Sequence, residues 1–163
     1  MLETRSSRKI EVEHVVLESA KPFAEVRQNI EAAFPPLDEE VTSLLRSGMS
    51  DALRRRLETL QGLFIFLKRD HGALVGLHGE PRHALQYEIG NPYTASTMTR
   101  YNLGAGLYAP LRIILYEKDG GGSRIEYDLP SSLFGQFGDD RITAESHRGD
   151  AALARKLSSA LDG

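Results

Sequence analysis

The chain has 163 residues, of which 40% are hydrophobic and 26% are charged, a composition typical of a folded globular protein and unlike that of disordered chains. Its formal net charge of −3 argues against a nucleic-acid-binding protein, which would carry an overall basic surface. Cysteine is absent, which excludes disulfides, thiolate metal sites and a cysteine nucleophile.

No stretch of the sequence has the character of a targeting or membrane segment. The N-terminal residues MLETRSSRKI lack the apolar core of a signal peptide. The longest apolar run, LFIFL at 63–67, is far shorter than the ~20 residues needed to cross a bilayer. We therefore expect a cytoplasmic protein with no membrane or nucleic-acid partner, folded as a single domain over 1–163.

The first part of the chain predicts one strand followed by three helices. Residues 10–18 (IEVEHVVLE) alternate imperfectly and indicate a strand. Residues 19–34 indicate a helix, which Pro35-Pro36 ends. Two short helices follow up to Gly62, and their apolar stripes consist of Leu37, Val41, Leu44 and Leu45, then Leu53, Leu57 and Leu60.

The second part predicts four more strands. Their sequences are LFIFLKRD (63–70), HALQYEIG (83–90), LRIILYE (111–117) and RIEYDLP (124–130). The glycine-rich segment KDGGGS between the last two indicates a hairpin. A phosphate-binding loop is the alternative for DGGGS. Such loops lie directly before the N-terminus of a helix, whereas here a strand follows.

Two helices are expected in this second part. Asn91 and Pro92 fit the N-cap and the first position of a helix over 92–102. A final helix is expected over about 150–161, because Gly149 weakens helix formation at its start. The pattern predicts an α+β fold: a two-layer sandwich with a mixed, mainly antiparallel sheet and helices packed on one face.

The five histidines do not show the spacing of a zinc site, so we expect no metal. Asp70-His71 is the pair best suited to chemistry, because an aspartate can orient an imidazole for acid–base work or ligation. It lies at the end of an apolar strand, where loops often carry function. A simpler interpretation is that Asp70 caps the turn before Gly72.

Several motifs together resemble the bacterial and archaeal Domain of Unknown Function 302 family. They are KRDHGAL, YEIGNP, GLYAPLRIILYEKDGG and RIEYDLPSSL. The resemblance covers about 63–133, with the strand and helix of 10–34 fitting in order. Residues 37–62 stand out as an extra helical insertion, and Gly72 replaces a common alanine, a change that we expect to matter little.

The resemblance implies a small two-layer α/β fold, often a homodimer, with no established activity. We expect a small-molecule or partner-binding module whose site combines His71, Tyr87, Asn91, Arg100 and Arg112. Arg100 or Arg112 would engage an anionic group, and His71 would hydrogen-bond to the ligand or coordinate it. A haem-like ligand or metal bound by His71 is one version, and a small carboxylate or phosphate metabolite is the other. The sequence names no cofactor.

Two alternatives stay open. The first is an acid–base enzyme, a hydrolase or isomerase, that uses Asp70 and His71. The second is a structural or interaction protein without a ligand, in which the segment SSLFGQFGDD is a dimer or partner contact. Phe134 and Phe137 would then be exposed anchors, although packing of both rings under the sheet is the favoured interpretation.

Overall fold

A five-stranded antiparallel sheet forms the centre of the molecule. The structure, a computed structural model, describes residues 5–48 and 50–162. The strands are β1 (His14–Ser19), β2 (Phe64–Asp70), β3 (Ala84–Gly90), β4 (Leu111–Glu117) and β5 (Ser123–Asp128). Their order is β1-β5-β4-β3-β2. All neighbouring strands are antiparallel, and the parallel component of the expected mixed sheet is only an isolated bridge between Pro36 and Ile65.

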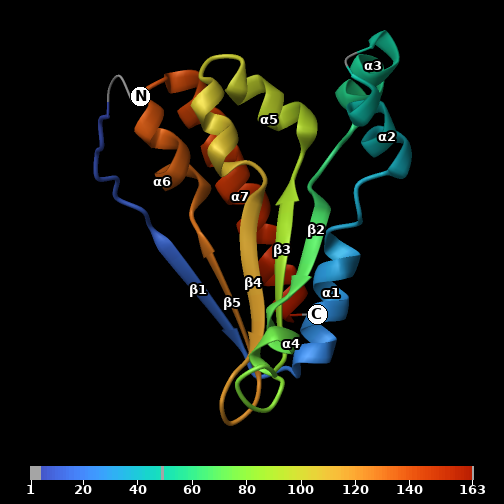
Figure 1. Cartoon of the computed structure of the whole chain (residues 1–163), viewed down its shortest axis with the longest axis vertical. Helices are drawn as coiled ribbons and strands as arrows, with labels where there is room; N and C mark the ends of the chain where they lie inside the picture. The colour runs from blue at the N-terminus through green and yellow to red at the C-terminus, as the bar shows by residue number, and fades with distance from the viewer. Residues whose placement is uncertain (1–4, 49, 163) are drawn as a thin grey trace.

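The helices leave one face of the sheet open (Figure 1). They are α1 (Phe23–Ala33), α2 (Glu39–Ser47), α3 (Asp51–Thr59), α4 (His71–Val75), α5 (Pro92–Thr99), α6 (Pro130–Phe134) and α7 (Asp140–Asp162). Two 3₁₀ turns, η1 (Leu103–Tyr108) and η2 (Gly135–Phe137), complete the chain. The α+β class and the helices packed on one face are as the sequence predicts.

The main core lies between the sheet and the pair α1 and α7. Alternate residues of β3, β4 and β5 point into it, as their strict burial pattern shows. From the helices, Val26, Ile30 and Leu157 are fully buried against these strands. Burying such side chains is the main favourable term in folding, so this layer holds the sheet in place.

The last helix is longer than the sequence predicts. It begins at Asp140 rather than near residue 150 and passes through Gly149 without a break. Ile142 and Ser146 are buried before the glycine, and Leu153 is buried after it. Packing along the whole helix therefore outweighs the unfavourable helix propensity of one glycine, about 1 kcal/mol.

A second, smaller core is formed by α2 and α3, which lie beyond the start of β2 (Figure 1). Its buried residues are Val41, Leu53, Leu57 and Leu60. A third cluster, at the α5 end, contains Met98, Ala105, Phe134 and Ile142. Phe134 is only 2% exposed and Phe137 is partly buried beside it, so the two phenylalanines pack inside rather than forming an exposed anchor pair. Across residues 5–48 and 50–162, no helix has the length and apolar character required to span a membrane.

Candidate functional site

The structure does not bring His71 and Arg100 to one site. His71 begins α4, which lies beside the β4–β5 hairpin at one end of the sheet. Arg100 follows α5, which lies at the opposite end (Figure 1). The length of the strands separates them, so the expected shared hollow for these two side chains is absent. The reason is topological: β2 and β3 are antiparallel, so their C-terminal ends lie at opposite ends of the sheet.

Asp70 has a capping role in this structure. Its Oδ1 accepts a hydrogen bond from the backbone N–H of Ala73 at 2.8 Å, the interaction of an N-cap. His71 is exposed. No hydrogen bond joins the Asp70 and His71 side chains, both of which the structure describes, so the geometry does not form an acid–base pair.

Tyr87 and the two arginines also lie in separate environments. Tyr87 is fully buried and its hydroxyl donates to Glu31 at 3.2 Å; burial, with the nearby Glu31 carboxylate, raises its pKa. Arg100 stacks over the ring of Tyr101, 4.5 Å from its centre. Arg112 lies on the open sheet face, opposite Glu88 in the strand register. These three side chains therefore do not face a common ligand.

Asn91 has the structural role that the sequence predicts. Its Oδ1 accepts from the N–H groups of Tyr93 and Thr94 at 2.9 and 3.2 Å, capping α5. Its Nδ2 donates to the carbonyls of Leu60 and Gly62 at 3.2 and 2.9 Å. One buried amide thus joins the start of α5 to the end of α3, and its hydrogen-bonding capacity is satisfied within the fold.

The hydroxyl groups of α5 are mostly occupied as well. Ser96, Thr97 and Thr99 donate to backbone carbonyls three or four residues earlier, at 2.6, 2.8 and 3.0 Å. Such back-bonding is common for these residues inside helices. Thr94 is different, because its hydroxyl makes no hydrogen bond to the described residues and its side chain borders a cavity.

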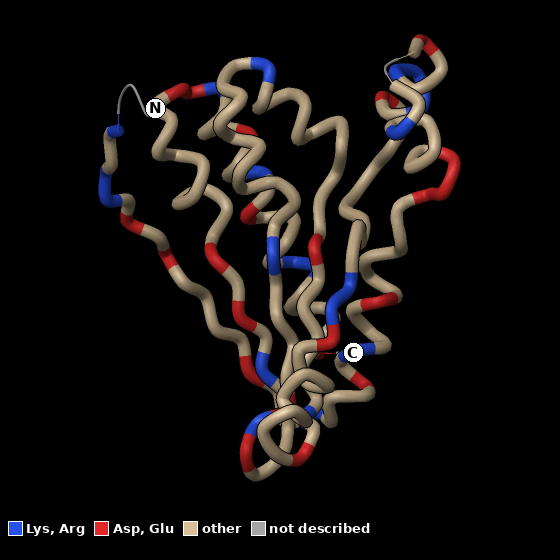
Figure 2. Tube along the Cα trace, in the orientation of Figure 1, with Lys and Arg blue, Asp and Glu red and all other residues tan. Residues whose placement is uncertain are grey.

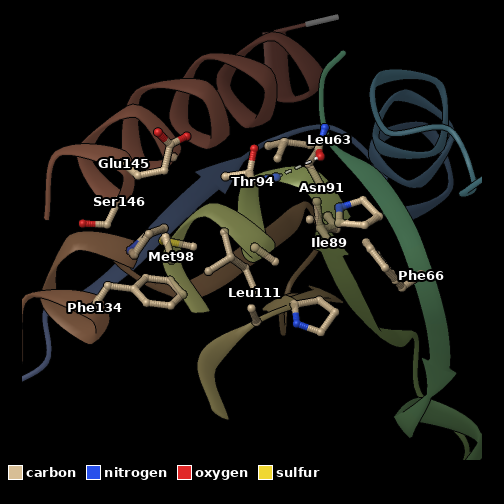
Figure 3. Close-up of a pocket in the computed structure, with 17 residues that line it drawn as sticks. Leu63, Phe66, Ile89, Asn91, Thr94, Met98, Leu111, Phe134, Glu145 and Ser146 are labelled. Atoms are coloured by element: carbon tan, nitrogen blue, oxygen red, sulfur yellow. Dashed lines mark hydrogen bonds between the residues drawn. The ribbon is translucent and has the colours of Figure 1, made fainter. Parts of the chain in front are cut away.

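That cavity, the end pocket, lies where β3 runs into α5 (Figure 3). It has a volume of about 170 Å³ and lies between the sheet end, α5, α6 and α7. Its apolar wall includes Leu63, Phe66, Ile89, Met98, Leu111 and Phe134. Gly90 and Gly149 also border it, and a Cβ at either position would meet its nearest neighbour at 3.5 and 3.8 Å. The φ angle of Gly90 is not positive, so this glycine provides space rather than an unusual backbone.

Few polar groups border the end pocket. Ser146 is 2% exposed, and its hydroxyl donates to the Thr143 carbonyl at 2.8 Å and points away from the cavity (Figure 3). Glu145 is the one charged side chain in the described lining. Its Oε2 accepts from Arg148 at 2.7 Å, and its side chain is 22% exposed. This end of the sheet therefore holds an apolar cavity with one carboxylate at its edge.

The size of the end pocket limits what it can hold. Pockets for drug-sized ligands measure about 300–1,000 Å³, whereas a dry cavity of about 150 Å³ accepts benzene. The end pocket therefore fits a single small ring or a short alkyl group. A tetrapyrrole is too large for it.

Sequence reasoning missed most of this lining. Phe66, Met98, Phe134 and Glu145 come from four elements and share no local motif. The signals in the sequence are indirect: Gly149 interrupts a helical pattern, and Gly90 precedes the Asn-Pro turn. Each glycine by itself indicates only a local backbone feature.

A second group of ionisable side chains lies on the open sheet face, where acidic and basic residues are interspersed along the strands (Figure 2). His14 Nδ1 lies 2.9 Å from Asp128 and its Nε2 lies 3.2 Å from Glu126. Hydrogen bonds to these carboxylates raise the pKa of His14. Glu126 also accepts from the hydroxyl of Tyr116, which lowers the pKa of the carboxyl group.

This group does not form a metal centre. The two carboxylates contact opposite nitrogens of the His14 ring, so the three side chains do not converge on one point. In the part of the chain that the structure describes, no cluster of three or more histidine and acidic side chains is arranged to hold a metal ion. The interactions instead link β1 to β5 across the sheet.

Comparison with known proteins supports the resemblance. The family model "Domain of unknown function DUF302" matches residues 47–163. The chain belongs to the Domain of Unknown Function 302 family. The match begins inside the 37–62 segment and includes all of α3. No curated protein matches the chain.

A solved structure shows the same fold. The crystal structure of an uncharacterized conserved protein of the Domain of Unknown Function 302 family from Bacillus stearothermophilus is similar, with a TM-score of 0.62. The superposition covers 91% of this chain and 95% of that chain, at 16% sequence identity. At this identity the likeness concerns the fold.

Proposed function

We propose that this member of the Domain of Unknown Function 302 family is a binding module for a small, largely apolar molecule held in the end pocket. The observation that carries the proposal is the cavity of about 170 Å³ with an apolar wall. Apolar cavities of this size bind small rings because the ligand restores van der Waals contacts that the empty wall lacks.

The position of the end pocket also supports binding. Its wall is assembled from strand ends, helices and the 109–111 segment, and Thr94 and Glu145 supply the polar atoms at its edge. Binding sites are commonly apolar hollows with a few polar groups that orient the ligand. Of the residues expected from the sequence to bind a ligand, Asn91 is the one that lines this cavity.

Methionine NMR tests the proposal directly. The chain has three methionines, and Met98 is 6% exposed in the pocket wall. In protein labelled with ¹³C-methyl methionine, we expect benzyl alcohol to shift the Met98 signal saturably, and Met98→Leu identifies that signal. Absence of a saturable shift at millimolar concentrations would contradict the proposal.

Two filling variants and a matched control make the test specific. Gly149→Leu and Ala95→Leu each place a side chain in the cavity from a different helix, and both should abolish the benzyl alcohol response. Ala151→Leu makes the same kind of change on the exposed surface of α7 and should leave it unchanged. Equal binding in all three variants would show that the probe binds elsewhere.

We also propose that the protein is a homodimer, as the resemblance implies. The sheet face that the helices leave open is available for association (Figure 1). Sedimentation equilibrium should then report twice the chain mass of 18.1 kDa. A single species at 18.1 kDa over a range of concentrations would contradict the dimer. The acid–base enzyme remains the weaker alternative because Asp70 is engaged in capping Ala73.

A further inference from the structure

A second hollow, the outer groove, adjoins the end pocket and lies between α3, α5 and α7. The outer groove has a volume of about 360 Å³. The two hollows share Leu63, Asn91, Thr94, Glu145 and Gly149. A ligand seated in the apolar end pocket would therefore extend its remaining atoms past Thr94 and Glu145 into the groove.

The chemistry changes sharply across this boundary. Glu145 is the single charged side chain among the described residues of the inner wall, whereas Glu58, Glu145 and Arg148 border the outer groove. Of these three side chains, Glu145 is the one that borders both hollows. It is therefore the charged group, among the described lining, that a ligand meets where the hollows adjoin.

The carboxylate of Glu145 retains binding capacity. Arg148 contacts Oε2 at 2.7 Å, while Oε1 makes no hydrogen bond to the described part of the chain. Arg148 is itself 75% exposed, and an exposed ion pair of this kind is weak. An added donor at Oε1 would form a charge-assisted hydrogen bond at the edge of an apolar cavity, where such bonds are stronger than in open water.

We propose that the ligand class is a small apolar amine, whose hydrocarbon part occupies the end pocket and whose protonated amino group binds Glu145 where the hollows adjoin. The inference rests on the proposed function, because it uses the same cavity. A carboxylate ligand would face Glu145 and would have to draw Arg148 away from it. A neutral ligand would fill the cavity without forming an ion pair with the Glu145 carboxylate.

Three probes of the same shape separate these possibilities. Benzylamine, benzyl alcohol and benzoate differ mainly in charge and can be titrated into the labelled protein at pH 7. We expect benzylamine to bind at least fivefold more tightly than benzyl alcohol, and benzoate to bind most weakly. Glu145→Gln should weaken benzylamine binding at least fivefold more than it weakens benzyl alcohol binding, which removes the preference for the amine.

Two further variants check the electrostatic cause. Arg148→Gln frees the second oxygen of Glu145 and should strengthen benzylamine binding, whereas Glu39→Gln, on the surface of α2, should change nothing. If all three probes bind equally, or benzoate binds best, the proposal of an amine ligand is wrong and the proposal that the end pocket binds a small apolar molecule stands. If none of the probes binds, both proposals fail.

Discussion

The roles of Asn91 and Gly72 follow from their contacts with nearby backbone groups. The amide of Asn91 contacts four backbone groups from two elements. The backbone of Gly72 packs against the segment leading into β3, and its carbonyl accepts a hydrogen bond from the Arg82 N–H at 3.2 Å.

Gly72→Ala is predicted to destabilise the protein, contrary to the expectation from sequence that alanine here matters little. A Cβ at this position would lie 1.9 Å from the Arg82 carbonyl oxygen and 2.6 Å from the Ala84 nitrogen. Both are backbone atoms, so the chain must shift. We expect a loss of about 1–3 kcal/mol in the free energy of unfolding, measured by urea denaturation.

Gly79→Ala is the matched control, because a Cβ there meets nothing within 4 Å. It should be neutral or slightly stabilising, since alanine restricts the unfolded chain more than glycine does. Equal stabilities of the two variants would mean that the α4 turn relaxes freely and that the close approach at Gly72 is unimportant.

At the scale of elements, polar side chains attach the edge strand β1 to the sheet. His14 lies between two carboxylates of β5, and Glu18 accepts hydrogen bonds from Arg124 at 2.9 and 2.5 Å. Arg124 also lies 3.7 Å from Glu126. Cross-strand pairs of opposite charge stabilise a sheet and help to set its register.

The attachment of β1 should depend on pH through His14. Hydrogen bonds to Asp128 and Glu126 raise the pKa of His14 above 6.5 in the folded protein. Its contribution to stability is therefore fully present below pH 6.5 and is lost as the pH rises through the folded pKa. We expect the difference in urea midpoint between wild type and His14→Gln to be largest near pH 5.5 and to disappear by pH 9.

High salt provides the check on this prediction. The His14 side chain is 51% exposed, so 1 M NaCl should reduce the difference at pH 5.5 by screening. His78→Gln, in the exposed loop after α4, should show no such pH dependence. A constant difference for His14→Gln from pH 5.5 to 9 would rule out an electrostatic role.

At the scale of the whole molecule, stability is divided between cores of unequal size. Among the described residues, fourteen buried side chains form the core between the sheet, α1 and α7, and four form the core of α2 and α3. Hydrogen bonds from Asn91 to Leu60 and Gly62 connect the smaller unit to the rest. Regions with few buried apolar contacts open more readily than the main core.

Hydrogen exchange should therefore show two levels of protection. We expect amides of α2 and α3 to exchange through local opening, faster than amides of β3 and β4, which exchange only on global unfolding. Asn91→Ala should widen this gap, because it removes the donor that binds the 60–62 segment. Identical protection across both units would show that the chain unfolds as one cooperative body.

Local patterns were enough to predict much of this architecture. Alternation or a β-rich composition indicated all five strands, helical spacing indicated α1, α2 and α3, and the Asn91-Pro92 pair located the start of α5. These predictions succeed because each depends on residues close together in the chain. The predicted start of α7, near residue 150, is wrong because the helix extends before Gly149 to Asp140. Burial of Ile142 and Ser146 against distant segments stabilises this extension.

Periodicity and capping are short-range properties, and they were therefore enough to predict most of the elements, the fold class and the cap at Asn91. Only the tertiary structure decided which ends of those elements meet. Because β2 and β3 pair antiparallel, His71 and Arg100 lie at opposite ends of the sheet. The same pairing, with α7 crossing behind it, brings Phe66, Met98 and Glu145 around one cavity. Their proximity comes from the packing of distant segments, which no spacing along the chain records.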